Sequence, residues 1–546
     1  MGIKNMKLKK TLAIVLSAVF ILSFTFAGTY SDNSVIEQVR ELLRTQYVDE
    51  IPDSVLNLPT VDEIIAEINK TDPHTKYFSA KDFTEFIDSI DNKFSGIGVQ
   101  IEYVPEGVQI ITVFEGSPAK SAGMESGDVI MMADNHLLAG LPDNVAINYI
   151  KGPEGTSVNL KVKRGTKLLS FNIIRKQISV PTVEGKILDN HIGYISVVSF
   201  GADTADKFGT VLAEQQSKKV DSYIIDLRNN GGGYLQTALD MAGYFIGNNK
   251  ALITKSKADG EVEYPAVYHK NVIDKPVIFL INGYSASASE VLSGAVKDYD
   301  KAYFLGVKSY GKGSVQITPQ LENKDYLKIT IAKFYSPKGN EINKVGITPD
   351  MEAPDKVDSM RVGELILDSP KTIASTKGYV KIETNNKSVI VKLTRANDSK
   401  FWAAYGQLIA NAAKQGKISI GNANGKGWTV ASKSAIADIA KLYFPSYKLT
   451  AKLKNFELNG TIKIKFNAKI AKNSLSAKNA ELIDAETGER IAIGFKAYSD
   501  KEVTVVPQKV LTKAKTYYMV VHPTLVKADK KELGVGMLDE ITTVAK

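Results

Sequence analysis

The sequence predicts a multidomain α+β protein, because its 546 residues change pattern several times along the chain. Residues 93–178 read as short strands separated by turns, residues 179–355 alternate buried strands with helices, and residues 451–546 return to strands alone. With 44% hydrophobic residues the chain can fill several cores, and its length suits about three or four domains.

Composition excludes several kinds of chemistry. There is no cysteine, which rules out disulfides, thiolate zinc sites and cysteine nucleophiles. The formal net charge is +9, but it comes mostly from scattered lysines, which does not indicate nucleic-acid recognition. The five histidines are spread without the spacing of metal ligands, and we therefore expect no metal and no cofactor.

Residues 1–29 predict export. Several lysines precede an apolar run over residues 11–28, as in a signal peptide, and Thr25-Phe-Ala27 offers a cleavage site. The run also approaches the length of a membrane span, so a cleaved signal peptide and an N-terminal membrane anchor both stay open. Either one places the remaining chain outside the cell, secreted or held at its surface.

Residues 30–92 are expected to form an N-terminal helical region, with helices over 35–47, 60–69 and 80–90. The sequence Thr71-Asp-Pro-His-Thr75 is a turn before the last of these helices. Nothing in this region has a catalytic context in the sequence.

In residues 93–178, two glycines precede an alternating strand, and a block of small residues runs from Ser117 to Ile130. These residues resemble a PDZ domain over their whole length. The resemblance implies a loop whose backbone N–H groups receive the C-terminal carboxylate of a peptide. That loop consists of Gly96, Ile97, Gly98 and Val99. The alternative is an ordinary hairpin glycine pair.

Residues 179–355 read as an α/β core. Strands are expected over 192–198 and 223–227, with a helix over 205–216 between them. The run Asp226-Leu-Arg-Asn-Asn-Gly-Gly-Gly233 then opens a helix, and its glycines allow the backbone to approach a ligand closely. A nucleotide-phosphate loop is disfavoured, because the Walker lysine and the dinucleotide glycine spacing are both absent.

A serine-rich junction follows in the same core. Val277–Ile281 reads as a buried strand, Asn282-Gly283 as a turn, and the chain from Ala288 onward as a helix. A hydroxyl at such a junction lies beside unpaired helix N–H groups, which suit a developing oxyanion. The simpler alternative is that Ser287 and Glu290 form a capping box.

Lys312 is the candidate base for this serine, because it lies between two glycines and burial can hold its amine neutral. Gln316 shares a strand face with Lys312 and could orient the amine without adding charge. Asp298 is unsuitable as a third member, since the intervening helix puts it roughly 16 Å from Ser287. The Ser309-Tyr-Gly-Lys312 pattern of penicillin-recognising enzymes needs a helical turn, which the glycines disfavour.

Residues from about 35 to 355 resemble the carboxyl-terminal processing proteases, or tail-specific proteases, a family of Ser/Lys-dyad serine peptidases with a PDZ domain. The resemblance rests on six segments taken together. These are the Asp72-Pro-His-Thr75 turn, the PDZ segment, Asp226–Gly233, Ser285–Glu290, Tyr310–Gln316 and Gly346–Asp350.

The resemblance implies a ClpP/crotonase-like protease core and assigns roles to single residues. Ser287 matches the nucleophile, Lys312 the general base and Gln316 the residue that orients the lysine. The implied oxyanion donors are the N–H of Ala288 and one in the glycine run, Gly231 or Gly232. A departure at Lys151, where relatives with a gating PDZ domain are expected to carry arginine, leaves that gating open.

The resemblance ends near residue 356. Residues 356–450 mix strand-like and helical patches and receive no assignment. Residues 451–546 show short strands between polar turns, which predicts a β-sandwich, and they are similar to bacterial Ig-like modules of secreted and surface-layer proteins.

Two functions follow from these observations. The first is an exported endopeptidase that captures free C-termini of proteins or peptides through its PDZ domain and cleaves at Ser287. The second is a non-enzymatic surface peptide-binding or scaffold protein with a degenerate protease fold. Further expected partners are a second copy of the chain and, through the C-terminal domain, the cell wall or surface.

Overall fold

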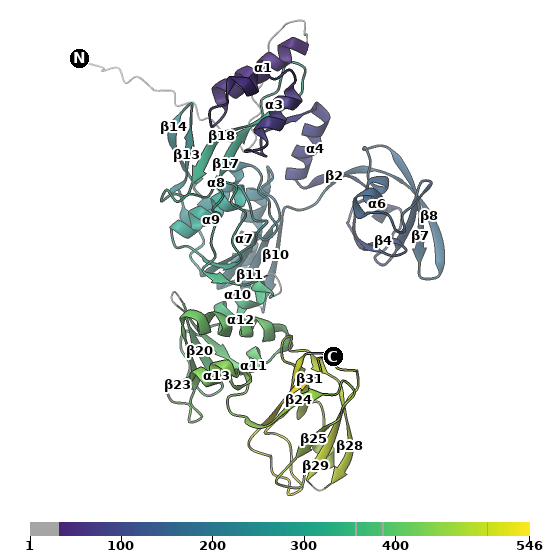
Figure 1. Ribbon diagram of the computed structural model, residues 1–546, viewed down its shortest axis with the longest axis vertical. Coiled ribbons are helices and arrows are strands. Elements are labelled where there is room, and N and C mark those ends of the chain that lie inside the picture. Colours follow the sequence, from purple (N-terminus) through teal and green to yellow (C-terminus); the bar gives the residue numbers. More distant parts are fainter. Residues whose placement is uncertain (1–31, 190, 355–356, 385–386, 500, 546) are drawn as a thin grey trace, which may run out of the picture.

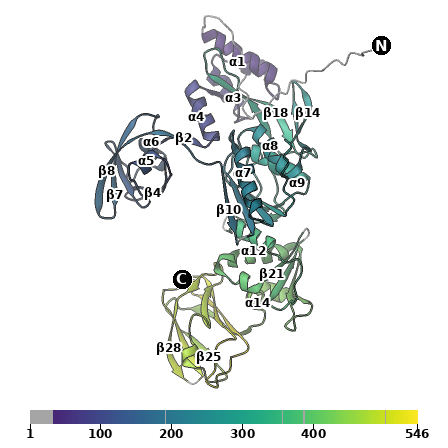
Figure 2. The ribbon, with the colours of Figure 1, turned by 180° about the vertical axis from the view of Figure 1, so that it is seen from behind.

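A six-stranded sheet at the middle of the chain positions the candidate site. The computed structural model describes residues 32–189, 191–354, 357–384, 387–499 and 501–545. The N-terminal helices, the sheet and the C-terminal domains follow one another along the long axis, and the domain formed by residues 93–179 lies to one side (Figures 1 and 2). The expected signal peptide or anchor, residues 1–29, lies outside the described residues.

The central sheet has the order β10-β11-β12-β15-β16-β19, in which every pair after β10–β11 is parallel. Successive strand residues point to opposite faces, so each strand feeds two cores. Phe279 and Ile281 pack toward the helices of one face, whereas Ile278 and Leu280 pack toward the opposite face. The strands are β10 (Val183–Leu188), β11 (Ile192–Val197), β12 (Ser222–Asp226), β15 (Val277–Ile281), β16 (Tyr303–Gly306) and β19 (Met351–Glu352).

Three helices cover the first face: α7 (Thr204–Ser217), α8 (Leu235–Ile246) and α9 (Ala288–Asp298). Helix α10 (Ser359–Leu367) contacts β12, β15 and β16 from the opposite face. The carboxyl ends of β11, β12, β15 and β16 therefore lie along one edge, where parallel sheets hold their ligands. The glycine run follows the end of β12, Ser287 follows that of β15, and Lys312 follows that of β16.

The N-terminal region packs against a second sheet. It contains α1 (Asp32–Gln46), α3 (Val61–Ile68) and α4 (Ala80–Ile90), which lie close to the three predicted helices, and a further short helix, α2 (Asp53–Leu56), which was not predicted. Strand β1 (Lys76–Phe78) pairs with the long strand β18 (Tyr326–Tyr335). The same sheet includes β13 (Lys250–Ser256), β14 (Gly260–Pro265) and β17 (Ser314–Ile317). Thus the N-terminal turn and the Lys312 segment belong to neighbouring parts of one sheet.

Residues 93–179 form a separate domain with its own core, which includes Val108, Ile130 and Val162. A two-stranded stalk, β2 (Lys93–Gly96) with β9 (Lys176–Ser179), joins it to the rest. Its sheet has the order β3-β4-β5-β7-β8, with β6 beside β5. The elements are β3 (Val99–Val104), β4 (Gly107–Val113), α5 (Pro118–Ser121), β5 (Val129–Ala133), β6 (His136–Leu137), α6 (Asp143–Ile150), β7 (Ser157–Arg164) and β8 (Lys167–Ile174).

The unassigned segment after residue 356 forms an α/β module on the second face of the central sheet. Its sheet has the order β21-β20-β22-β23, and the largest helix, α12, buries Trp402 and Tyr405. The elements are β20 (Tyr379–Glu383), β21 (Ser388–Lys392), α11 (Leu393–Ala396), α12 (Ser399–Gln415), β22 (Lys417–Gly421), β23 (Trp428–Val430), α13 (Lys433–Ala437) and α14 (Ala440–Tyr443).

The chain ends in two small sheets, β24-β31-β30-β26-β27 and β25-β29-β28, which enclose a core and form the predicted β-sandwich. Their strands are β24 (Lys448–Phe456), β25 (Ile462–Lys465), β26 (Ala480–Asp484), β27 (Arg490–Ile491), β28 (Ile493–Ser499), β29 (Glu502–Pro507), β30 (Thr516–Val521) and β31 (Met537–Thr543). Among the helices that the structure describes, none has the length and apolar character to cross a membrane.

Candidate active site

Ser287 occupies a strained position between β15 and α9. Its backbone has φ 56° and ψ −115°, and residues other than glycine rarely adopt a positive φ. Its residue is only 7% exposed, and it lines a cavity of about 320 Å³ together with Lys312 and Gln316. The structure therefore brings both members of the predicted dyad, and the glutamine expected to orient the lysine, to one cavity.

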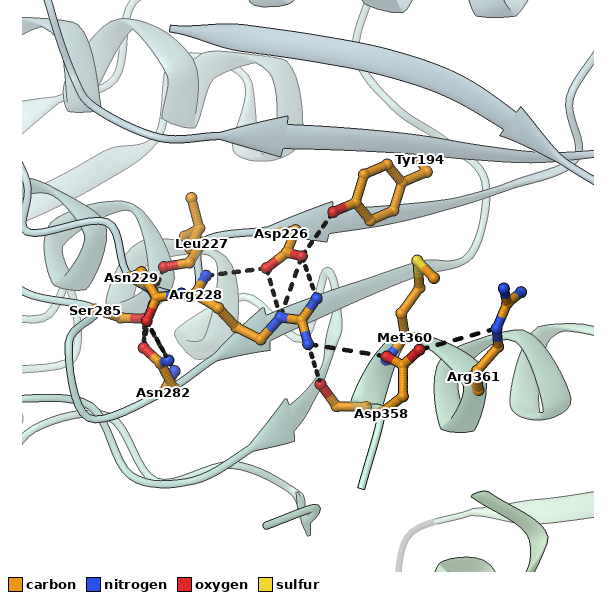
Figure 3. A network of polar contacts seen from close by, with 11 residues as sticks. Tyr194, Asp226, Leu227, Arg228, Asn229, Asn282, Ser285, Asp358, Met360 and Arg361 are labelled. Carbon is orange, nitrogen blue, oxygen red and sulfur yellow. Dashed lines mark hydrogen bonds and ion pairs between the residues drawn. The ribbon is translucent and has the colours of Figure 1, made fainter. Parts of the chain in front are cut away.

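Polar contacts hold the turn before Ser287 against the loop after β12 (Figure 3). Asn282 accepts the N–H of Asn229 through its side-chain oxygen at 2.9 Å, and its amide nitrogen donates to Asn229 Oδ1 at 2.8 Å. The Ser285 hydroxyl donates to the Leu227 carbonyl oxygen at 2.8 Å. These bonds fix the serine junction relative to the glycine run.

Asp226 and Arg228 anchor the other end of that loop. Tyr194 donates its hydroxyl to Asp226 at 2.7 Å, and the Arg228 guanidinium donates to both carboxylate oxygens (Figure 3). Arg228 also donates to the Ser359 hydroxyl at 3.2 Å, which ties the loop to the start of α10. The Asp226–Arg228 pair does not line the Ser287 cavity, and it helps to hold the glycine run in place by fixing the start of the loop.

Gly232, the middle glycine of the run, approaches Ser287 so closely that a side chain would not fit there. A Cβ on Gly232, whose φ is +104°, would lie 2.8 Å from Ser287 Cβ and 2.9 Å from the Ala288 nitrogen. The Gly232 N–H donates to Asn230 Oδ1 at 2.9 Å. Gly231 lines the cavity, and a Cβ there would meet open space. Ala288 is the first residue of α9, where N–H groups have no intrahelical acceptor.

Glu290 connects the two candidate catalytic segments, a role that the sequence did not reveal. Its Oε2 accepts the N–H groups of Ser287 at 2.9 Å and Lys312 at 2.8 Å. Its Oε1 accepts the Gly311 N–H and the Ser309 hydroxyl, both at 2.6 Å. The residue is fully buried, and this burial raises the pKa of Glu290 although the four donors oppose the shift.

The Glu290 bonds also clarify two sequence interpretations. The glutamate half of the expected capping box is present, but it serves Lys312 as well as Ser287. Ser309 donates to Glu290 and accepts the Ile347 N–H, so it is committed elsewhere and does not pair with Lys312. The Asp298 carboxylate accepts bonds from Lys338 and Asn340 at the far end of α9, as expected for a structural role.

Lys312 enters the cavity from the loop between β16 and β17. Gly313 has no room for a side chain, since a Cβ there would lie 2.2 Å from the Asn343 nitrogen. The pKa of Lys312 is lowered to about 8, chiefly by burial and next by the positive charge of Lys328, while Asp72 and Glu290 oppose the shift. A substantial neutral fraction of this amine therefore exists at mildly alkaline pH.

Gln316 uses its amide nitrogen to bond two hydroxyls. It donates to Ser314 at 2.9 Å and to Thr330 at 3.3 Å. Its carbonyl oxygen is then the group that can accept a hydrogen bond from the Lys312 amine.

The N-terminal turn lies beside Lys312, which sequence reasoning missed. The Asp72 carboxylate accepts the His74 N–H at 3.0 Å and the Thr75 hydroxyl at 2.7 Å. Burial, followed by the charge of Lys312, lowers the pKa of His74 to about 4, so this imidazole is neutral near pH 7. Only the pairing of β1 with β18 brings the turn there, and no local pattern reports such pairing.

The predicted carboxylate loop lies in the side domain, between the stalk and the free edge strand β3. The carbonyl oxygens of Ile97 and Gly98 accept bonds from Ala119 and Phe114 within the domain. Lys151 borders Gly96, and its ammonium lies 5.5 Å from the centre of the Phe94 ring. Peptide binding by this loop stays a prediction. Across the described ranges, no three His, Asp or Glu side chains gather where they could hold a metal ion.

Comparison with known protein families matches three parts of the chain. Residues 191–353 match peptidase family S41, residues 95–174 the PDZ domain, and residues 438–534 a bacterial Ig-like domain. These matches confirm the expected fold of each part. The domain boundaries expected from the sequence stay predictions.

Two relatives are matched over most of their length. The chain is 32% identical over 361 residues to carboxy-terminal processing protease CtpB of Bacillus subtilis (strain 168), covering 65% of this chain and 72% of that protein. It is 31% identical over 346 residues to a carboxy-terminal-processing protease of Bartonella bacilliformis, covering 62% and 79%. A solved structure, the photosystem II D1 C-terminal processing protease, aligns with a TM-score of 0.40 at 22% identity, covering 60% of this chain and 94% of that one.

Proposed function

This chain belongs to the carboxy-terminal processing proteases of peptidase family S41, and we propose that it is an exported serine endopeptidase with a Ser287–Lys312 dyad. The observation that carries the proposal is the shared cavity. It holds a buried serine hydroxyl at a strained helix start and a lysine whose pKa is lowered to about 8. A nucleophile and a base of suitable pKa are the two groups that acyl transfer requires.

The proposed reaction proceeds through an acyl-enzyme. The Ser287 oxygen attacks the carbonyl carbon of the scissile peptide bond while the neutral Lys312 amine takes the hydroxyl proton. Lys312 then gives this proton to the leaving amine, and the C–N bond breaks. A water molecule, deprotonated by the same amine, releases the acyl group and regenerates Ser287.

The negative charge on the carbonyl oxygen is assigned to two backbone donors. One is the Ala288 N–H at the start of α9. The second is Gly231, because the Gly232 N–H already donates to Asn230. A substitution at Gly232 would still be harmful, since its close packing against Ser287 shapes the cavity.

We further propose that the PDZ domain receives the free C-terminus of the substrate. Its edge strand β3 can add a peptide strand, and the loop from Gly96 to Val99 precedes that edge. Export is supported by residues 1–29 and by the bacterial Ig-like domain, a type of module that suits surface exposure. Association with the cell surface through that domain, and pairing of two chains, stay predictions.

The test is cleavage of an unfolded protein by the purified chain. Wild type should degrade labelled casein, whereas Ser287→Ala and Lys312→Ala should show no activity above buffer. Lys312→Arg should also be inactive, because a guanidinium does not lose its proton in proteins. Thermal unfolding of each variant checks that the fold is retained. Full activity in a folded Lys312 variant would remove the dyad and bring His74 forward as the base.

A further inference from the structure

A second lysine lines the catalytic cavity and has no part in the dyad. Lys328, on β18, lies in the same cavity wall as Ser287 and Lys312. Its ammonium lies 4.8 Å from the centre of the Phe86 ring and 5.6 Å from that of Phe78, and these rings stack on each other. Within the described residues the ammonium forms no ion pair. A desolvated cation without a carboxylate partner is unfavourable for stability, which points to a functional reason.

The charged groups around Lys328 come from four segments. Lys76 on β1 is its partner across the strand pair, and Lys312 approaches from the loop before β17. Asp72 and His74 lie on the N-terminal turn, where both Asp72 oxygens already accept bonds from that turn. Glu290 is turned toward the backbone of the Lys312 loop. In the part of the chain that the structure describes, no carboxylate lines the cavity.

We propose that Lys328 is a positioning residue whose positive charge favours the neutral, proton-accepting amine of Lys312. Two ammonium groups facing one partly dry cavity repel each other with little screening, because the Debye length is about 8 Å at physiological salt. The flanking aromatic faces stabilise the charged form of Lys328. Lys312, which has no such ring partners among the described residues, is then the lysine that gives up its proton first.

Burial and then the charge of Lys76 also lower the pKa of Lys328, but the pKa of Lys312 is lowered more, to about 8. After burial, the charge of Lys328 is the strongest influence that lowers the pKa of Lys312. Asp72 acts in the opposite direction on both lysines. The inference rests on the proposed role of Lys312 as base, and the two can be tested separately.

The experiment measures how fast a fluorophosphonate probe labels Ser287 in the full-length chain between pH 6 and 10. Labelling forms a bond from the Ser287 oxygen to phosphorus, releases fluoride and transfers the serine proton to Lys312, without any need for substrate recognition. Wild type should show a rate that rises with pH. In Lys328→Met the rise should move upward by on the order of one pH unit, so the rate near pH 7 falls about tenfold and recovers at high pH.

Three further variants separate charge from shape. Lys328→Arg keeps the charge and should keep the wild-type profile. Asp72→Asn removes the opposing charge and should move the rise to lower pH. Lys333→Met removes a lysine of the same strand that pairs with Asp49 at 3.0 Å, and it should leave the profile unchanged.

The results that would overturn the role of Lys328 differ from those that would overturn the proposed function. Superimposable pH profiles for wild type and Lys328→Met would overturn the inference, as would a rate reduced equally at every pH. If Lys328→Met does not fold, Lys328→Gln and Asp72→Asn decide the question by the sign of their shifts. Absence of labelling at Ser287 in wild type, or undiminished labelling in Lys312→Ala, would instead overturn the proposed function.

Discussion

At the scale of single residues, the fold holds Lys312 where burial disfavours the charged form of its amine. The pKa of Lys312 falls from the 10.5 of an ordinary lysine to about 8. Between these values the unfolded chain binds more protons than the native one, so stability rises with pH across this window. Below pH 8 the full penalty applies, because the native state must hold the charged amine in a desolvated cavity.

Removing the amine should therefore stabilise the protein while it removes activity. Lys312→Met is expected to raise the free energy of unfolding at pH 7 by about 1 to 3 kcal/mol, with the gain vanishing above pH 10.5. Denaturant unfolding of the core at pH 7 and pH 10.5 measures the effect, with Lys333→Met as the control. A methionine variant that is less stable than wild type at both pH values would contradict the prediction.

Sequence reasoning identified site residues only where a local pattern reports them. Ser287 lies at a recognisable strand–turn–helix junction, and Lys312 lies between glycines that its tight loop requires. Glu290 has a local signature as a cap, but its bonds to the Lys312 loop depend on tertiary structure. Asp72 is brought beside Lys312 by the pairing of β1 with β18, and Lys328 is brought into the cavity wall by the pairing of β18 with β17; no spacing in the sequence encodes either pairing.

At the scale of elements, the stalk and the cavity wall form one continuous segment. Phe86 and Ile90 of α4 line the cavity, and Asn92, at the entry to β2, lines it as well. The chain therefore passes directly from the catalytic cavity into the PDZ stalk. A peptide bound at the edge strand β3 is connected to the cavity through few intervening residues.

Peptide capture by the PDZ domain should depend on a free carboxylate. In full-length Ser287→Ala, which cannot cleave, a peptide with an apolar free-acid C-terminus should bind at least tenfold more tightly than its amide, because the loop N–H groups receive the charge. Fluorescence anisotropy measures both affinities. Equal affinities, or no binding at millimolar peptide, would leave the domain as a spacer.

The structure also limits which variant can serve as a control in that experiment. Gly98→Val is unsuitable, because a Cβ on Gly98 would lie 2.3 Å from Ser117 Cβ and its φ is +81°. Such a variant would disturb the domain itself. The amidated peptide changes the ligand alone and leaves the protein intact.

At the scale of the whole molecule, the α/β module is part of the protease core. Its residues share one buried cluster with the second face of the central sheet and with β30 and β31 of the sandwich. Five aliphatic side chains of that sheet face are completely buried there. They are Ile192, Ile224, Ile278, Leu280 and Leu305. The sequence did not assign this module because its apolar residues are explained only by the sheet that they cover.

Truncation after residue 354 should therefore abolish soluble expression. Exposing five large aliphatic side chains to water costs roughly 8 to 15 kcal/mol of hydrophobic free energy. This cost is comparable to the entire free energy of unfolding of a typical domain. Replacing residues 93–179 by a short linker should be tolerated, since that domain has its own core. Solubility and thermal unfolding of the two variants are compared. A soluble truncated chain that still labels at Ser287 would contradict the prediction.

The shared core links the packing of the central sheet to the order in which the chain is synthesised. Leu538, on the last strand of the chain, belongs to the same buried cluster as Ile224 and Ile278 beneath the catalytic edge. A chain emerging from the ribosome has already made Ser287 and Lys312 long before that strand exists. The second face of the sheet that carries them is covered by α10 and by the α/β module, which are made later, so the order of translation itself delays the moment at which this edge is fully packed.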